Sequence, residues 1–99
     1  MLSSIEFKYF EYLNKNNIVW IKPKPLKYFL NDKQHLYFPD FYLPETDEYI
    51  EIKGYMWPKD EIKMKQVILN NPLINLKVIN KFELELLSGT VTQSRRVQP

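Results

Sequence analysis

Residues 36–54 read LYFPDFYLPETDEYIEIKG, and this stretch decides the fold that the rest of the chain is expected to adopt. Residues 36–43 and 49–53 are rich in aromatic and β-branched side chains, which favour strands. Residues 44–48, which lie between them, have the composition of a turn. The sequence therefore predicts a β-hairpin folded about residues 45–46.

The second strand of this hairpin alternates in polarity. Its two-residue period places Tyr49, Glu51 and Lys53 on one face, and Ile50 and Ile52 on the other. A carboxylate and an ammonium therefore share one face of the strand. A Glu and a Lys at this spacing are, taken alone, more often solvated surface residues than catalytic ones.

A second carboxylate is expected to meet the first across the hairpin. The predicted fold places Asp40 opposite Glu51, with Cβ atoms roughly 4.5–5.5 Å apart. Like charges in this position destabilise a hairpin unless a cation neutralises them, and Mg²⁺ prefers oxygen ligands. We expect Mg²⁺, with Mn²⁺ as a substitute, and the backbone carbonyl of Ile52 as a further ligand. The Lys53 ammonium could stabilise charge on a phosphate or orient an attacking water.

The first helix is predicted from about residue 4 to residue 15. Residues 3–6 read Ser-Ser-Ile-Glu, which is typical of a capping box in which the Ser3 hydroxyl and the Glu6 carboxylate each bind a backbone N–H. Glu6 therefore has two interpretations, a helix cap or a further metal ligand, and spacing does not decide between them.

The remaining pattern predicts a small α/β domain with a mixed sheet flanked by helices, in the order α-β-β-β-α-β. Residues 18–21 are expected to form a strand, Pro23 and Pro25 an extended edge, and residues 26–30 a further edge strand before a turn at 31–34. A helix should open at residues 57–60 and end before Pro72. A strand is predicted at 76–79 and a short helix at 81–87, so that residues 1–87 form one domain and 88–99 a flexible polar and basic tail.

Composition excludes several classes of protein. The 99 residues contain no cysteine, which excludes disulfides, thiolate metal sites and a cysteine nucleophile. No apolar run approaches the roughly 20 residues that a membrane span needs, and the first residues lack a signal pattern, so we expect a cytoplasmic protein without a membrane partner.

The formal net charge of +2 is too small to indicate a nucleic-acid binder by itself. The acids cluster, however, because residues 40–51 contain five acids and no base. Basic side chains elsewhere could contact phosphates, although each is equally consistent with an ordinary solvated residue; they are Lys22, Lys24, Lys27, Lys59, Lys63, Lys65, Arg95 and Arg96.

Residues 37–44 and 49–54, YFPDFYLP and YIEIKG, resemble the active-site hairpin of PD-(D/E)xK nucleases of the restriction-endonuclease-like superfamily. Over about residues 4–79 the chain is more narrowly similar to the phage endonuclease I family of Holliday-junction resolvases. The resemblance implies a restriction-endonuclease-like core and a metal-dependent DNA endonuclease with Glu6, Asp40, Glu51 and Lys53 in its active site. It also implies DNA as partner, branched or bent, and a junction-resolving or nicking activity in a host-cell cytoplasm.

Two further points stay open from the sequence. The protein could work as a homodimer or with a targeting protein partner. The alternative function is a catalytically silent DNA-binding or interaction module that keeps a nuclease fold, although packing alone does not require Asp40, Glu51 and Lys53 together.

Overall fold

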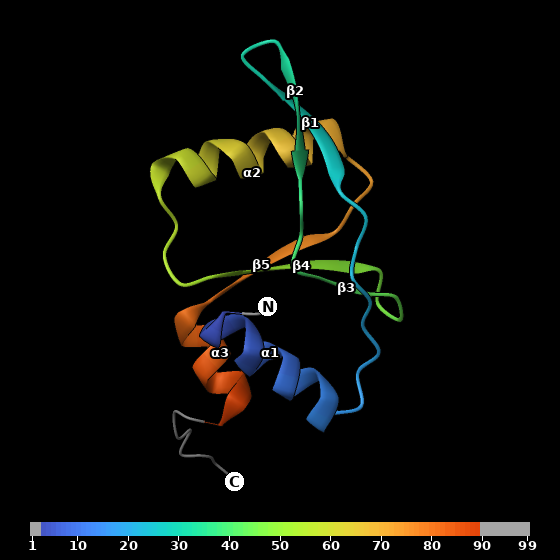
Figure 1. The fold of residues 1–99 in the computed structure, drawn as a ribbon, viewed down its shortest axis with the longest axis vertical. Helices are drawn as coiled ribbons and strands as arrows, with labels where there is room; N and C mark the ends of the chain where they lie inside the picture. Colours follow the sequence, from blue (N-terminus) through green and yellow to red (C-terminus); the bar gives the residue numbers. More distant parts are fainter. Residues whose placement is uncertain (1–2, 90–99) are drawn as a thin grey trace, which may run out of the picture.

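The computed structural model describes residues 3–89, and this part of the chain is a mixed α/β fold, as the sequence predicts (Figure 1). Its elements are, in chain order, α1 (Ser4–Lys15), β1 (Leu26–Leu30), β2 (Lys33–Tyr37), β3 (Phe41–Leu43), β4 (Glu48–Lys53), α2 (Pro58–Asn70), β5 (Leu76–Asn80) and α3 (Lys81–Ser88). The predicted tail, with Arg95 and Arg96, falls almost wholly on residues 90–99, which lie outside the described residues.

The strands form two sheets, not the single sheet that the sequence predicts. The central sheet has the order β3-β4-β5, in which β3 and β4 are antiparallel while β4 and β5 are parallel. This sheet is therefore mixed, as expected. The strands β1 and β2 form a separate antiparallel hairpin, which contacts α2. Figure 1 shows α2 on one side of the central sheet, and α1 and α3 together on the other.

The first helix begins as predicted. The Glu6 N–H donates to Ser3 Oγ at 3.2 Å, and the Ser3 N–H donates to Glu6 Oε1 at 3.1 Å. Each bond satisfies an N–H that no earlier helical turn can pair. The capping box is therefore confirmed. The first turn of α1 lies next to the end of β4, where the Ile5 side chain approaches Gly54.

Two strand predictions are wrong, and proline explains both. Residues 18–21 contribute only a bridge between Ile21 and Tyr42 and no strand, because Pro23 and Pro25 lack the N–H groups that would continue the ladder. Residues 36–43 are not one strand. The buried Pro39 interrupts them, so that β2 pairs with β1 while β3 pairs with β4.

The other predicted elements agree with the structure to within one or two residues. The turn predicted at 31–34 is shorter, because Asn31 and Asp32 both adopt positive φ and Lys33 already pairs in β2. The helix α2 ends before Pro72, as predicted, and β5 and α3 each extend one residue further than expected.

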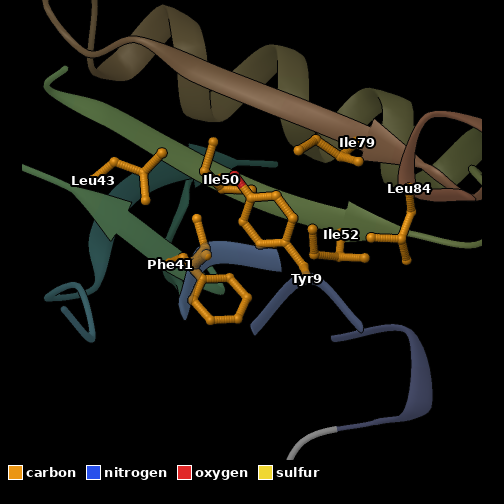
Figure 2. Close-up of a cluster of buried hydrophobic side chains, with 8 residues drawn as sticks. Tyr9, Phe41, Leu43, Ile50, Ile52, Ile79 and Leu84 are labelled. Atoms are coloured by element: carbon orange, nitrogen blue, oxygen red, sulfur yellow. The ribbon is translucent and has the colours of Figure 1, made fainter. Parts of the chain in front are cut away.

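Each side of the central sheet carries its own hydrophobic core. The first core lies on the side of α1 and α3, and Figure 2 labels all of its members except Leu13; they are Tyr9, Leu13, Phe41, Leu43, Ile50, Ile52, Ile79 and Leu84. On the side of α2, a smaller core gathers Tyr28, Tyr37, Met64 and Val67. Within residues 3–89, no helix combines the length and the apolar character that crossing a membrane requires.

Candidate active site

The β3–β4 hairpin brings Asp40 to the backbone of β4. The pairing of Phe41 with Ile50 is the predicted register. One residue before that pair, the Asp40 N–H donates to the Ile50 carbonyl at 3.0 Å, and Asp40 Oδ2 accepts from the Ile52 N–H at 2.8 Å. These two bonds fix the Asp40 carboxylate beside the strand that carries Glu51.

Glu51 is held by Tyr37, which lies at the end of β2. Its side chain is buried, with 8% of its surface exposed, and Glu51 Oε1 accepts a hydrogen bond from the Tyr37 hydroxyl at 2.5 Å. Burial and then the nearby Glu51 charge raise the pKa of Tyr37, so this hydroxyl stays a proton donor at neutral pH. Tyr37 therefore fixes the orientation of Glu51, a role that sequence reasoning missed.

Lys53 lies between two carboxylates. Its Nζ is 4.0 Å from Glu51 Oε2 and 3.7 Å from Asp60 Oδ1. Asp60, in the first turn of α2, is itself buried, and its Oδ2 accepts from the Trp57 N–H at 3.1 Å. The sequence pattern places Asp60 only within the predicted opening of a helix at residues 57–60, because nothing in the spacing shows that α2 begins beside the end of β4.

The surroundings of Asp40 and Glu51 disfavour the charged forms of both carboxyl groups. The pKa of Asp40 is raised to about 7. Burial is the largest cause, the charges of Glu51 and Glu6 also raise the pKa, and the hydrogen bond from the Ile52 N–H lowers it. Burial also raises the pKa of Glu51, although the Tyr37 hydroxyl and Lys53 oppose this shift. A bound cation would relieve the cost of ionising both groups.

Asp60 shows the opposite behaviour. Burial acts to raise its pKa, but the Trp57 N–H and the charges of Lys53, Lys63 and Lys59 outweigh it, so the pKa of Asp60 is lowered. Asp60 is therefore the ionised partner that anchors Lys53, whereas Asp40 and Glu51 are the carboxylates with unfavourable charge to neutralise.

Glu6 acts as a helix cap in this structure, since its carboxylate binds the Ser3 N–H. Its charge nevertheless raises the pKa of both Asp40 and Glu51, which places it within electrostatic reach of the site. Across residues 3–89, no group of three or more His, Cys, Asp or Glu side chains is arranged to hold a metal ion. The roles of Glu6 and of the Ile52 carbonyl as metal ligands stay predictions.

Among the basic residues that the sequence singles out, Lys63 reaches the site. Its Nζ lies 5.6 Å from the centroid of the Tyr37 ring, and its charge lowers the pKa of Glu51. Lys59 is exposed and close enough to Asp60 to lower its pKa. The other lysines of this set are exposed at the surface, and no ion pair described for residues 3–89 joins them to the site; they are Lys22, Lys24, Lys27 and Lys65.

The surface hollows found within residues 3–89 are not lined by Asp40 or Glu51. One groove lies between α1 and α3 and is lined by residues such as Phe10 and Leu86. A second hollow lies near residues 45–48 at the other end of the hairpin. Neither is lined by Asp40, Glu51 or Lys53, so the site has no enclosed pocket of its own among these hollows.

Comparisons with family models, with curated protein sequences and with solved structures return no significant match. The resemblance of residues 37–54 to nuclease motifs stays an expectation from sequence, and the functional argument depends on the geometry of the site.

Proposed function

We propose that this protein is a metal-dependent DNA endonuclease that hydrolyses phosphodiester bonds, with a restriction-endonuclease-like core. The observation that carries the proposal is the convergence of two carboxylates with raised pKa, Asp40 and Glu51, beside the Lys53 ammonium. Packing does not require these three groups together, since burial raises the pKa of both carboxylates and so disfavours their charged forms. A site that neutralises phosphate charge and holds a cation needs all three.

The donor atoms fit a hard divalent cation. Asp40 and Glu51 offer carboxylate oxygens, and Asp40 is already bound to the Ile52 N–H, so the backbone of Ile52 lies next to it. Oxygen ligands suit Mg²⁺, with Mn²⁺ as a substitute. When bound, such an ion would polarise the phosphate and lower the pKa of a bound water.

The protein side chains have separate roles in the proposed reaction. Asp40 and Glu51 would hold the cation, and their carboxylates are oriented by the Ile52 N–H and the Tyr37 hydroxyl. Lys53, positioned by Asp60, stabilises the negative charge that develops on the phosphate. Lys63 and Lys59 on α2 supply further positive charge along the approach of a phosphate backbone. Action on branched DNA, and work as a homodimer or with a targeting protein, depend on the sequence resemblance alone.

The test is cleavage of a panel of labelled DNAs in Mg²⁺ or Mn²⁺: four-way junction, duplex, nicked duplex, flap and single strand. We expect metal-dependent cleavage that Asp40→Asn abolishes and that Lys53→Met lowers about 10²–10³-fold. The matched control is Glu45→Gln, which removes an exposed acid from the turn of the same hairpin and should leave cleavage unchanged. Full activity in Asp40→Asn would refute the proposal. DNA binding without cleavage of any substrate would favour the catalytically silent module.

A further inference from the structure

Three aromatic side chains next to the candidate active site are exposed. Phe38, Tyr55 and Trp57 have 61%, 63% and 57% of their surface accessible, whereas Trp20 packs against the core. Phe38 lies two residues before Asp40, and Tyr55 lies two residues after Lys53. We call Tyr55 and Trp57, whose rings are in contact, the aromatic rim. Single exposed aromatic side chains are common, whereas neighbouring ones that form a continuous apolar surface often mark a binding site.

The geometry of the rim leaves ring surface free for a ligand. The rings of Tyr55 and Trp57 lie 4.6 Å apart at 72°, edge to face, so they do not cover each other by parallel stacking. An aromatic ring with an open face can stack on a nucleobase.

The rim is connected to the candidate catalytic ammonium. The Trp57 N–H donates to Asp60 Oδ2, and Asp60 Oδ1 lies 3.7 Å from Lys53 Nζ. The donor is the backbone N–H, so this bond fixes the main chain at Trp57, which carries the ring, relative to the group that would meet the phosphate. Lys59 and Lys63, on the same helix that Trp57 precedes, give this surface the positive charge that a phosphate backbone attracts. Aromatic rings interleaved with lysines are typical of surfaces that bind single strands.

We propose that the aromatic rim stacks on unpaired bases of single-stranded DNA next to the scissile phosphate. Paired bases in a continuous duplex are stacked on each other and cannot offer their faces to these rings. This inference rests on the proposed nuclease function and deepens it, because it assigns single-stranded DNA, or the single-stranded part of a flap, as the preferred substrate over intact duplex.

The test is DNA binding in a chelator, where no metal-dependent cleavage occurs. The variant Trp20→Phe leaves Trp57 as the single tryptophan, and titration with a short oligothymidine should quench its fluorescence. We expect at least 10-fold tighter binding to this oligonucleotide than to a duplex of the same length. Trp57→Ala and Tyr55→Ala should each weaken single-strand binding at least about 5-fold, since stacking contributes roughly 1–3 kcal/mol per base, while duplex binding stays unchanged.

Phe29→Ala is the matched control, because Phe29 is a similarly exposed aromatic residue on the β1–β2 hairpin, 51% accessible. It should leave single-strand affinity unchanged. The inference is overturned if Trp57→Ala and Tyr55→Ala bind single strands as tightly as the wild type, or if they lose affinity for duplex equally. It is also overturned if Trp57→Ala only abolishes self-association measured by sedimentation, which would assign the rim to a second copy of the chain.

Failure of the inference and failure of the proposed function are distinguishable. If the protein cleaves duplex DNA, Lys53→Met slows this cleavage about 10²–10³-fold and single strands cause no quenching, the proposed nuclease stands and the stacking inference is wrong. If single strands quench the fluorescence of Trp57 but the protein cleaves none of the DNAs, the stacking inference stands and the proposed endonuclease function is wrong.

Discussion

The two faces of β4 differ in what they bury. One face carries Ile50 and Ile52 into the core beneath α1 and α3, where their neighbours are apolar. The other carries Glu51 and Lys53 toward Tyr37 and Asp60, where each charged group has a specific polar partner. The first face stabilises the fold by removing apolar surface from water. The second face carries Glu51 beside Asp40, and the pKa of both carboxyls is raised. We infer that these two groups lower the stability of the fold in the absence of a cation and are present for function.

The largest effect on stability is expected on the apolar face. Ile50→Ala removes a side chain that is 1% exposed and should lower the free energy of unfolding by about 2–5 kcal/mol, because it leaves a cavity. Leu73→Ala, at a position 96% exposed, is the control and should change the stability by less than about 0.5 kcal/mol. Urea unfolding followed by circular dichroism measures both. Equal losses in the two variants would contradict the assignment of this face to stability.

The largest effect on activity is expected on the polar face. Lys53→Met should lower the single-turnover rate of cleavage about 10²–10³-fold, since it removes the positive charge next to the phosphate. Circular dichroism should show a folded protein. The control Lys77→Met removes an exposed lysine from β5, outside the site, and should cleave at the wild-type rate. A Lys53→Met variant as active as this control would remove Lys53 from the mechanism.

A smaller effect is expected for the residue that positions Lys53. Asp60→Asn should lower the cleavage rate about 10-fold at saturating Mg²⁺, because loss of the charge frees the ammonium from its anchor. The Mg²⁺ concentration at half-maximal rate should not change, and Asp60→Glu should restore part of the rate. The control is Glu61→Gln, which removes the neighbouring exposed acid and should leave the cleavage rate unchanged. A changed Mg²⁺ requirement in Asp60→Asn would instead indicate that Asp60 is a metal ligand.

A further effect, on stability and not on the cleavage rate, is a pH dependence of stability in a chelator. Because the pKa of Asp40 is raised from 3.8 to about 7 in the folded protein, folding favours the protonated carboxyl. Its contribution is therefore fully present below about pH 4 and is lost as pH rises toward 7. The Tm of the wild type should fall over this range relative to that of Asp40→Asn. A constant difference in Tm between the two proteins would contradict the raised pKa.

The hairpin and its chemistry could be predicted from sequence because they depend on local pattern. Alternation in residues 49–53 sets the two faces of β4, and the turn composition sets the register that brings Asp40 to Glu51. The break at Pro39 was missed because strand composition continues on both sides of it. Tyr37 and Asp60 were missed for another reason, since their partners lie in other elements and the contacts depend on how β2 and α2 pack on the sheet.

The most direct test of the central claim is the Tm of the wild type and of Asp40→Asn, in a chelator and in saturating Mg²⁺. A cation that binds only the folded state raises stability by about 2.7 kcal/mol at 100 times its Kd. We expect Mg²⁺ to raise the Tm of the wild type and to leave that of Asp40→Asn unchanged, and we expect the variant to be at least as stable as the wild type in the chelator at pH 8. The central claim is that the apolar face of β4 stabilises the fold and the polar face binds a cation. An unchanged Tm of the wild type, or an equal rise of Tm in both proteins, would contradict this claim.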